Sequence, residues 1–287
     1  MELDLDASLE RILRLAKVAL QEAKWDECAL KSSEVISIIV AAGATTNPNV
    51  FETELVTSKI MLGISETMKN ALDHAAECFL SLSSLDFQSD VSEWPQDRIA
   101  LLAVLAIVGN PKVYREQIIT TLTDSVKSIV REFFDEEPIP KLLNLGKLVS
   151  HCKFGDSIAL LDSMISSDPV KSLRIPVAVT DTIQSNFTNF CMSESASCYK
   201  SVSIEALAQE LSLSQSDTLT RLSELIMIEK ARLSNYRIDL KTYRVSRKTN
   251  QGLQDIQTVN NLREVLQNLD LLAFKKQLTE SGIRIDN

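Results

Sequence analysis

Glycine and aromatic residues are scarce in this sequence. The 287 residues include 7 glycines, and phenylalanine, tryptophan and tyrosine together make up 5%. Strands favour aromatic side chains and the tight turns between them favour glycine, so this composition argues against an all-β fold. Leucine, alanine, serine, glutamate and lysine dominate instead, a mixture that suits helices. We therefore expect a mostly helical protein.

The residues of familiar catalytic sites are also missing. There are 2 histidines, His74 and His151, and they lie far apart in the sequence. The chain has no Gly-x-x-x-x-Gly-Lys-Ser/Thr loop, no Gly-x-Gly-x-x-Gly and no Gly-x-Ser-x-Gly. Paired acids such as Glu136 and Glu137 are more typical of a solvated turn than of a general acid and base. The sequence therefore predicts a protein that is not an enzyme, with no cofactor, no metal and no small-molecule substrate.

Two further absences concern the compartment. No Cys-x-x-Cys occurs among the 5 cysteines, so neither a zinc site nor a disulfide framework is indicated, and we interpret the cysteines as small buried hydrophobic residues. No apolar run is long enough to span a bilayer, and no charged-then-apolar leader opens the chain. We expect a soluble intracellular protein of the cytoplasm and nucleus.

Negative charge dominates, but unevenly. The net charge is −9. From Cys198 to the end, 13 Lys and Arg stand against 11 Asp and Glu, a net of +2, whereas the residues before it carry 17 against 28, a net of −11. An acidic body repels phosphates and so disfavours broad nucleic-acid binding.

Helical hairpins are predicted for the N-terminal part. The run Ala23–Cys28 resembles the turn of a tetratricopeptide repeat, where a bulky ring wedges between two helices and a small residue three positions on marks their contact. Trp25 and Cys28 would supply these two residues. A second turn of this kind is predicted at 70–75. A binding solenoid and plain helical packing both fit this pattern.

The middle of the chain continues with helices. A polar segment, 83–95, predicts a linker. The strongly apolar run Arg98–Val108 predicts a buried helix that Gly109 ends, and 142–152 and 156–165 predict a further pair. Four parts follow: 1–95 with tetratricopeptide-like hairpins, 96–197 with helical repeats, 198–249 with a winged helix, and 250–287 with a last helix.

The stretch 201–247 carries the clearest pattern. Two helices are indicated by helical spacing of apolar residues, namely Ile204, Leu207, Ala208 and Leu211, then Leu219, Leu222, Leu225 and Ile226. Ser203 is the expected N-cap of the first, and Ser214 with Asp217 forms a shortened capping box for the second. Strand-like alternation follows, first at Tyr236, Ile238 and Leu240 and then at Tyr243 and Val245, with a turn at 241–242. Helix, turn, helix and hairpin is the layout of a winged helix.

A last helix is predicted after Gly252. It has an apolar stripe at Leu262, Leu266, Leu269 and Ala273, broadened by other apolar residues. A helix that is apolar on more than one side must be buried on more than one side. Packing in a bundle shared with other subunits is the preferred interpretation; folding back onto the repeats is the alternative.

These features together resemble the PCI domain family, found in the proteasome lid, the COP-nine signalosome and a translation initiation factor. Tyr236-Arg237-Ile238-Asp239 is similar to the Ala-Arg-Ile-Asp with which the first signalosome subunit and its lid paralogue enter the wing. The resemblance covers about Arg98 to Arg247. It implies a mostly α fold, a helical-repeat array that ends in a winged helix with a small antiparallel sheet, and winged helices that join neighbouring PCI subunits through their sheet edges.

Two functions follow from this resemblance and from the residues. The preferred one is a non-catalytic scaffold subunit of the COP-nine signalosome, which acts in cullin deneddylation, with the proteasome lid as the alternative. The partner-binding residues would be Tyr236, Arg237, Ile238, Asp239, Tyr243, Arg244 and Val245, with Leu262, Leu266, Leu269 and Ala273 of the last helix. The alternative of another class is a nucleic-acid adaptor. It is disfavoured because Arg221 is the only cation between Gln215 and Glu229.

Overall fold

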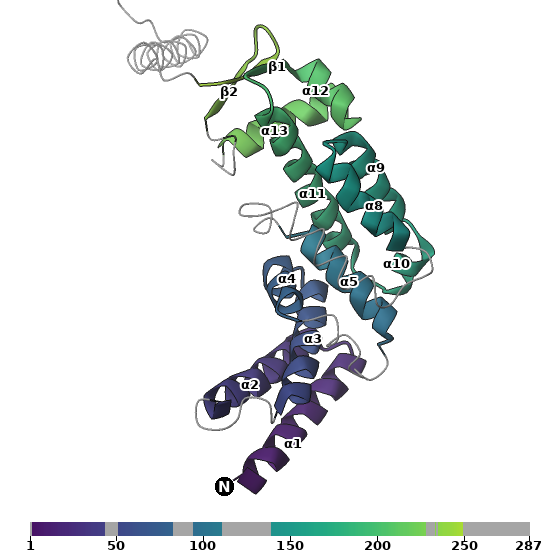
Figure 1. Ribbon diagram of the computed structural model, residues 1–287, viewed down its shortest axis with the longest axis vertical. Coiled ribbons are helices and arrows are strands. Elements are labelled where there is room, and N and C mark those ends of the chain that lie inside the picture. The colour runs from purple at the N-terminus through teal and green to yellow at the C-terminus, as the bar shows by residue number, and fades with distance from the viewer. Residues whose placement is uncertain are drawn as a thin grey trace, which may run out of the picture. The chain divides into compact units, whose positions relative to one another are not determined.

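The chain is mostly helical and carries one small antiparallel sheet, as Figure 1 shows for a computed structural model. The structure describes residues 2–43, 51–82, 94–110, 139–227, 233 and 235–248. The chain divides into two compact units, 1–246 and 247–287. The description that follows concerns the first unit and the two described residues beyond it, Arg247 and Lys248. The prediction of a mostly helical protein is confirmed.

The described elements are mostly helices. The first five are α1 (Glu2–Gln21), α2 (Trp25–Gly43), α3 (Glu52–Met68), α4 (Leu72–Leu80) and α5 (Gln96–Val108). Then come α8 (Ile139–Ser150), α9 (Phe154–Ile165), α10 (Asp168–Ser172) and α11 (Val177–Ser197). The chain continues with β1 (Ser201–Ser203), α12 (Ile204–Leu211), α13 (Gln215–Met227), β2 (Tyr236–Asp239) and β3 (Arg244–Arg247).

Three helix pairs ahead of the sheet, α1–α2, α3–α4 and α8–α9, are joined by the same kind of turn, which also ends α12 at Ser212. In each turn one residue has a left-handed backbone: Ala23 with φ 55°, Asn70 with φ 65° and Cys152 with φ 56°. The next residue donates its N–H to a carbonyl five positions back, as Lys24 does to Ala19 at 2.9 Å. Ala71 and Lys153 make the same bond, to Glu66 at 2.8 Å and to Leu148 at 2.9 Å. This is the Schellman motif, which ends one helix while the next begins.

Each of these turns is followed by a large apolar residue and then, three positions on, by a small buried one. The large residues are Trp25, Leu72 and Phe154, and the small ones are Cys28, Ala75 and Ser157. Leu72 and Phe154 are buried, and Trp25 packs half-buried against the same core. Trp25 and Cys28 thus lie in the first turn of α2, where Cys28 is fully buried. The small residues let the second helix of each pair approach the rest of the array closely.

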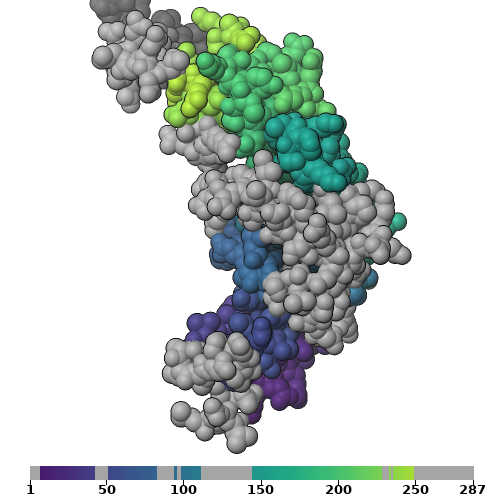
Figure 2. All heavy atoms as spheres, in the orientation of Figure 1, coloured from purple at the N-terminus to yellow at the C-terminus, as the bar shows by residue number. Residues whose placement is uncertain are grey.

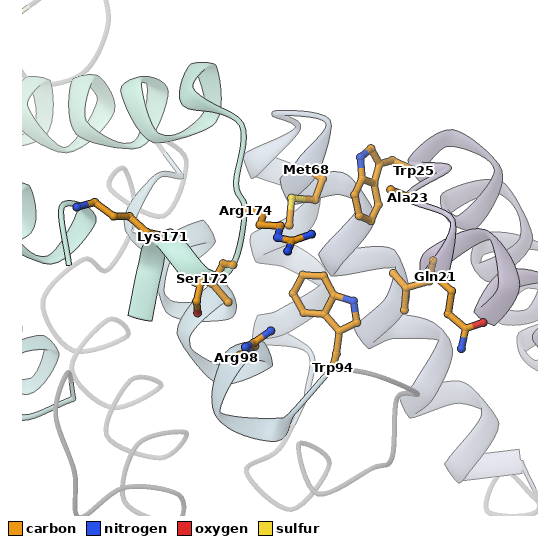
Figure 3. A pocket seen from close by; sticks show the side chains of 11 residues that line it. Gln21, Ala23, Trp25, Met68, Trp94, Arg98, Lys171, Ser172 and Arg174 are labelled. Carbon is orange, nitrogen blue, oxygen red and sulfur yellow. The ribbon is translucent and has the colours of Figure 1, made fainter. Parts of the chain in front are cut away.

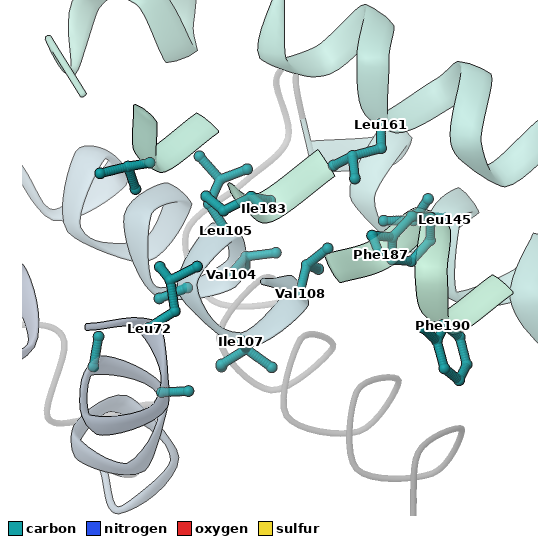
Figure 4. Packing of buried hydrophobic residues seen from close by; sticks show 14 of the residues in the cluster. Leu72, Val104, Leu105, Ile107, Val108, Leu145, Leu161, Ile183, Phe187 and Phe190 are labelled. Atoms are coloured by element: carbon teal, nitrogen blue, oxygen red, sulfur yellow. The ribbon is translucent and has the colours of Figure 1, made fainter. Parts of the chain in front are cut away.

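The core of the first unit consists of one large hydrophobic cluster and a small second one of Leu9, Val35 and Ile39. One hydrophobic cluster includes buried residues from Ala16 to Val245. In its middle lies α5, whose residues 99–108 are all buried, as the apolar run predicted. Figure 4 shows α5 side chains between Leu72 of α4 and Ile183 of α11. A Cβ at Gly109 would lie 2.7 Å from Ile183 and 2.8 Å from Leu72, so the end of α5 is held against both helices.

The sheet has the strand order β1-β3-β2. Strand β1 runs antiparallel to β3, with Val202 opposite Val245 and Ser203 opposite Arg244. The sequence predicted the hairpin but missed β1, in which an apolar valine stands between two serines. Both predicted helix starts are confirmed: Ser203 Oγ accepts from Ala206 N at 3.1 Å, and Ser214 Oγ accepts from Asp217 N at 3.0 Å.

Other predictions need correction or lie outside the described residues. Cys152 and Cys198 are exposed, not buried as predicted, and Cys28 and Cys191 are buried. The helix predicted at 142–152 ends at Ser150, so His151 lies just beyond it. The predictions that fall outside the described residues are the linker at 83–93, the acidic turn with Glu136 and Glu137, and the last helix after Gly252. In the described ranges, no helix has the length and apolar character needed to cross a membrane.

Candidate interaction surface at the sheet

The three-stranded sheet is tied to the end of α11 by one tyrosine. Tyr236 begins β2, and its side chain is 4% exposed. Its hydroxyl lies 3.3 Å from the carbonyl oxygen of Ser197 and 3.2 Å from that of Tyr199. The ring thus packs into the core while the hydroxyl donates to backbone at the end of α11, where carbonyl groups lack helical partners. Tyr236 positions β2 from the inside.

A glutamate makes the matching connection from α12. Glu210 accepts from the hydroxyl of Ser195 at 2.7 Å through Oε1 and from the hydroxyl of Tyr199 at 3.1 Å through Oε2. The hydrogen bond to Glu210 holds the pKa of Tyr199 above its ordinary value. Both oxygens of one carboxylate therefore hold α12 against the C-terminal end of α11, and no sequence pattern indicated this role.

The same helix also contacts α9 closely. A Cβ at Gly155, in the first turn of α9, would lie 2.5 Å from the carbonyl oxygen of Glu210 and 3.0 Å from Oγ of Ser212. In the space-filling view of Figure 2 the green atoms of residues near 200–225 lie directly against teal atoms of residues near 150–165. The sheet and its two helices therefore share one packed body with the helices before them.

Strand β2 lies at one edge of this sheet. It pairs with β3 on one side, and the part of the chain that the structure describes supplies no strand on its other side. Arg237 and Asp239 are exposed, and Ile238 packs half-buried against the core. A strand with one unpaired side presents backbone donors and acceptors that can pair with a strand of another chain.

The turn after β2 differs from the prediction. It spans 240–243 rather than 241–242. Asp239 organises it by accepting from Lys241 N at 2.9 Å and from the hydroxyl of Thr242 at 2.8 Å. The hydrogen bond from Thr242, followed by the one from Lys241, lowers the pKa of Asp239. Leu240 and Tyr243 were predicted to lie on the apolar face of the strands, but they belong to this turn and are 64% and 58% exposed.

The predicted role of the next strand also needs correction. The edge was expected to include Arg244, but β3 is the central strand, and Arg244 is paired with Ser203 of β1. Its Nε donates to Oγ of Ser201 at 3.1 Å. Val245 is 0% exposed, so its side chain belongs to the core and is closed to a partner. Because Arg244 lies on the central strand, replacing it with proline would disturb pairing inside the sheet and would not block an edge strand.

Helix α13 offers little positive charge to a nucleic acid. Its cation, Arg221, is half-buried and donates through Nε to Asp217 at 3.1 Å. Through Nη1 it donates to Oγ of Ser185 and Oδ1 of Asn189, both on α11 and each at 3.3 Å. Arg221 therefore connects α13 to α11. Among the described residues, the exposed cations of the hairpin are Arg237, Lys241, Arg244, Arg247 and Lys248.

Two other predicted features complete the picture. The apolar stripe of the last helix, Leu262, Leu266, Leu269 and Ala273, lies outside the described residues. In the ranges that are described, no group of three or more histidine, cysteine, aspartate and glutamate side chains is placed to hold a metal ion. The structure thus brings together Arg237, Ile238 and Asp239 at one strand edge and leaves Tyr236 and Val245 in the core.

No protein-family model matches this sequence, and no curated protein matches it either.

Proposed function

We propose that this chain is a non-catalytic scaffold subunit of a PCI-type complex and that the open edge of β2 is one of its joints. The observation that carries the proposal is the position of β2: it is an edge strand, and Tyr236 fixes it to the body through backbone carbonyls of Ser197 and Tyr199. A rigidly held edge strand suits β-augmentation because a partner strand then meets backbone groups already in place.

The arrangement of elements supports the finer identification of the fold. The order β1, α12, α13, β2, β3 with the strand sequence β1-β3-β2 fits a winged helix. The three pairs joined by Schellman turns fit tetratricopeptide-like hairpins that lead up to it. Repeats that end in a winged helix are the architecture of the PCI resemblance. Within that family the similarity of Tyr236–Asp239 favours the COP-nine signalosome, with the proteasome lid as the alternative, and a cytoplasmic and nuclear location.

A nucleic-acid adaptor is the rival proposal, because winged helices often place their second helix in a major groove. Arg221 argues against it, since its guanidinium is engaged by Asp217, Ser185 and Asn189. Contact through the hairpin cations alone would reach phosphates without reading bases and would weaken steeply with salt. Titration with duplex DNA and RNA at two salt concentrations separates the two proposals: tight, salt-resistant binding would favour the adaptor.

The direct test is to purify the native protein under mild conditions and identify what accompanies it by mass spectrometry. We expect other PCI subunits in fixed proportion, and signalosome subunits in particular. Recovery as a lone chain would contradict the scaffold proposal. Recovery with lid subunits would keep it and change the complex.

The joint itself is tested with two proline variants of β2, Arg237→Pro and Ile238→Pro. Successive residues of an antiparallel edge strand alternate between pairing inward and facing away, so one variant removes an outward donor and the other a donor to β3. The variant that keeps its melting temperature should lose the neighbouring subunit in a pull-down. If that folded variant retains the neighbour at the wild-type level, assembly runs through another surface.

A further inference from the structure

A hollow of about 680 Å³ lies far from the sheet, within the first unit. It is formed by the turn after α1, the end of α3, the start of α5 and the end of α10, and Figure 3 shows it from close by. Its size is within the range of about 300–1,000 Å³ that suits a small ligand or a few side chains, and far below what a folded domain needs.

The walls combine aromatic and cationic residues. Trp25 and Trp94 line the hollow together with Met68, and the cations are Arg98, Lys171 and Arg174. In Figure 3 the two indole rings and the guanidinium of Arg174 point toward one another, whereas the amino group of Lys171 points away from them. The described lining residues include no aspartate or glutamate.

The three cations differ from their neighbours in having no ion-pair partner among the residues that the structure describes. Two acids beside the turn after α1 pair with lysines that do not line the hollow: Glu22 with Lys24 at 2.6 Å, and Asp26 with Lys69 at 3.1 Å. In a chain with a net charge of −9, a hollow whose described lining holds three exposed cations and no acid is a local positive site. Such a site attracts an anionic group.

We propose that this hollow binds a short acidic peptide segment of a partner protein. Arg98 and Arg174 would engage carboxylates, since the guanidinium fork matches a carboxylate with two parallel hydrogen bonds. An apolar side chain next to these carboxylates would insert between the tryptophans and Met68. A nucleic acid is a poorer occupant, because the residues before Cys198 carry a net charge of −11 and would repel a long phosphate backbone. The site uses none of the residues of the β2 joint.

Intrinsic fluorescence provides the assay, because the chain has 2 tryptophans and both line the hollow. The full chain is titrated with a short synthetic peptide in which glutamates flank one leucine and one phenylalanine, so that the peptide adds no tryptophan signal. We expect a saturable change in tryptophan emission that weakens with added salt. The matched control is the same peptide with glutamine in place of every glutamate, which should bind at least about tenfold more weakly, since each charge-assisted pair contributes more than a neutral one.

Single substitutions test whether the peptide binds in this hollow. Arg174 has φ 53°, a backbone that glycine adopts freely, so Arg174→Gly removes the guanidinium without straining the turn. This variant and Arg98→Ala should each weaken binding of the glutamate peptide about tenfold, and neither should lower the melting temperature. Lys147→Ala, which removes an exposed charge on α8 outside the hollow, should leave binding unchanged.

Three results would overturn the proposal. The first is equal binding of the glutamate and glutamine peptides. The second is unchanged affinity in Arg174→Gly and Arg98→Ala. The third is a change in tryptophan emission with duplex RNA but none with the peptide, which would assign the hollow to nucleic acid.

Discussion

At the scale of single residues, Tyr236 holds the fold of its own chain together. Its buried ring and its hydroxyl contacts with Ser197 and Tyr199 fix the start of β2. Any contact that β2 makes with a partner therefore depends on its backbone and on exposed side chains such as Arg237. The same logic applies to Val245, which is fully buried on the central strand.

Leu222 provides a test of the packing beneath the sheet. It is 0% exposed on α13, so Leu222→Ala should lower the free energy of unfolding by about 2–5 kcal/mol, the range for a large-to-small change in a core. Met227, on the same helix, is 82% exposed, and Met227→Ala should change it by no more than about 0.5 kcal/mol. Urea unfolding of both variants measures the difference, and equal effects would show that α13 is not packed in this way.

The cysteines give a second test at this scale. Cys152 and Cys198 are exposed, so they should react with a thiol reagent at pH 8 in the native protein. Burial, with the nearby Glu66 charge, raises the pKa of the Cys78 thiol to about 11. Its labelling should therefore be slow at pH 8 and accelerate as the pH rises toward that value, since the thiolate is the reactive form. Burial also raises the pKa of Cys28 and Cys191. Rapid labelling of either in the native state would contradict their burial.

At the scale of elements, the repeated turn organises the helical pairs. Ala23, Asn70 and Cys152 all adopt left-handed backbone conformations, yet none is glycine. For an L-residue with a Cβ this conformation costs roughly 1–2 kcal/mol. The chain tolerates the cost because the Schellman hydrogen bonds and the buried residues that follow hold each turn in place.

The same substitution at two positions tests this view of the turn. Ala23→Gly should raise the free energy of unfolding by about 0.5–1 kcal/mol. Glycine relieves the strain at φ 55°, but it also loses more backbone entropy on folding, which cancels part of the gain. Ala159→Gly, at an exposed position within α9, should lower it by about 1 kcal/mol. Thermal melts compare the two. Loss of stability in both would show that the turn after α1 is not left-handed.

Elements with local signals were predictable from the sequence, and elements defined by pairing were not. The starts of α12 and α13 were predicted because Ser203 and Ser214 are caps that act within three residues. Strand β1 was missed because three residues become a strand only when β3 lies beside them. The central place of Arg244 was missed for the same reason: alternation indicates a strand but does not order the strands in a sheet. The hollow at Trp25 and Trp94 joins residues that lie far apart in sequence, so no local pattern indicated it.

At the scale of the whole molecule, the first unit is one body. Its core cluster includes residues of α1 and of β3, and Gly155 and Gly109 mark places where helices meet too closely for a Cβ. Packed side chains therefore connect the N-terminal helical pairs to the sheet. Residues 247–287 belong to a separate compact unit.

This division predicts the result of a truncation. Deletion from Gly252 onward should leave a folded chain with an unchanged near-ultraviolet circular dichroism spectrum, because residues 1–246 form their own unit. The proposed bundle of last helices would be lost, so the truncated chain should enter the complex incompletely in a pull-down. Unfolding of the truncated chain would instead assign the last segment to the fold of the first unit.

The most direct measurement of the central claim is amide hydrogen exchange on the free chain and on the purified complex. In the free chain, amides of β2 that face away from β3 should exchange quickly, and those of the central strand β3 slowly. On assembly, we predict that the amides at 236–239 gain protection while those at 244–247 change little. Unchanged exchange in β2, together with new protection on another surface, would contradict the claim that this edge joins the chain to its neighbour.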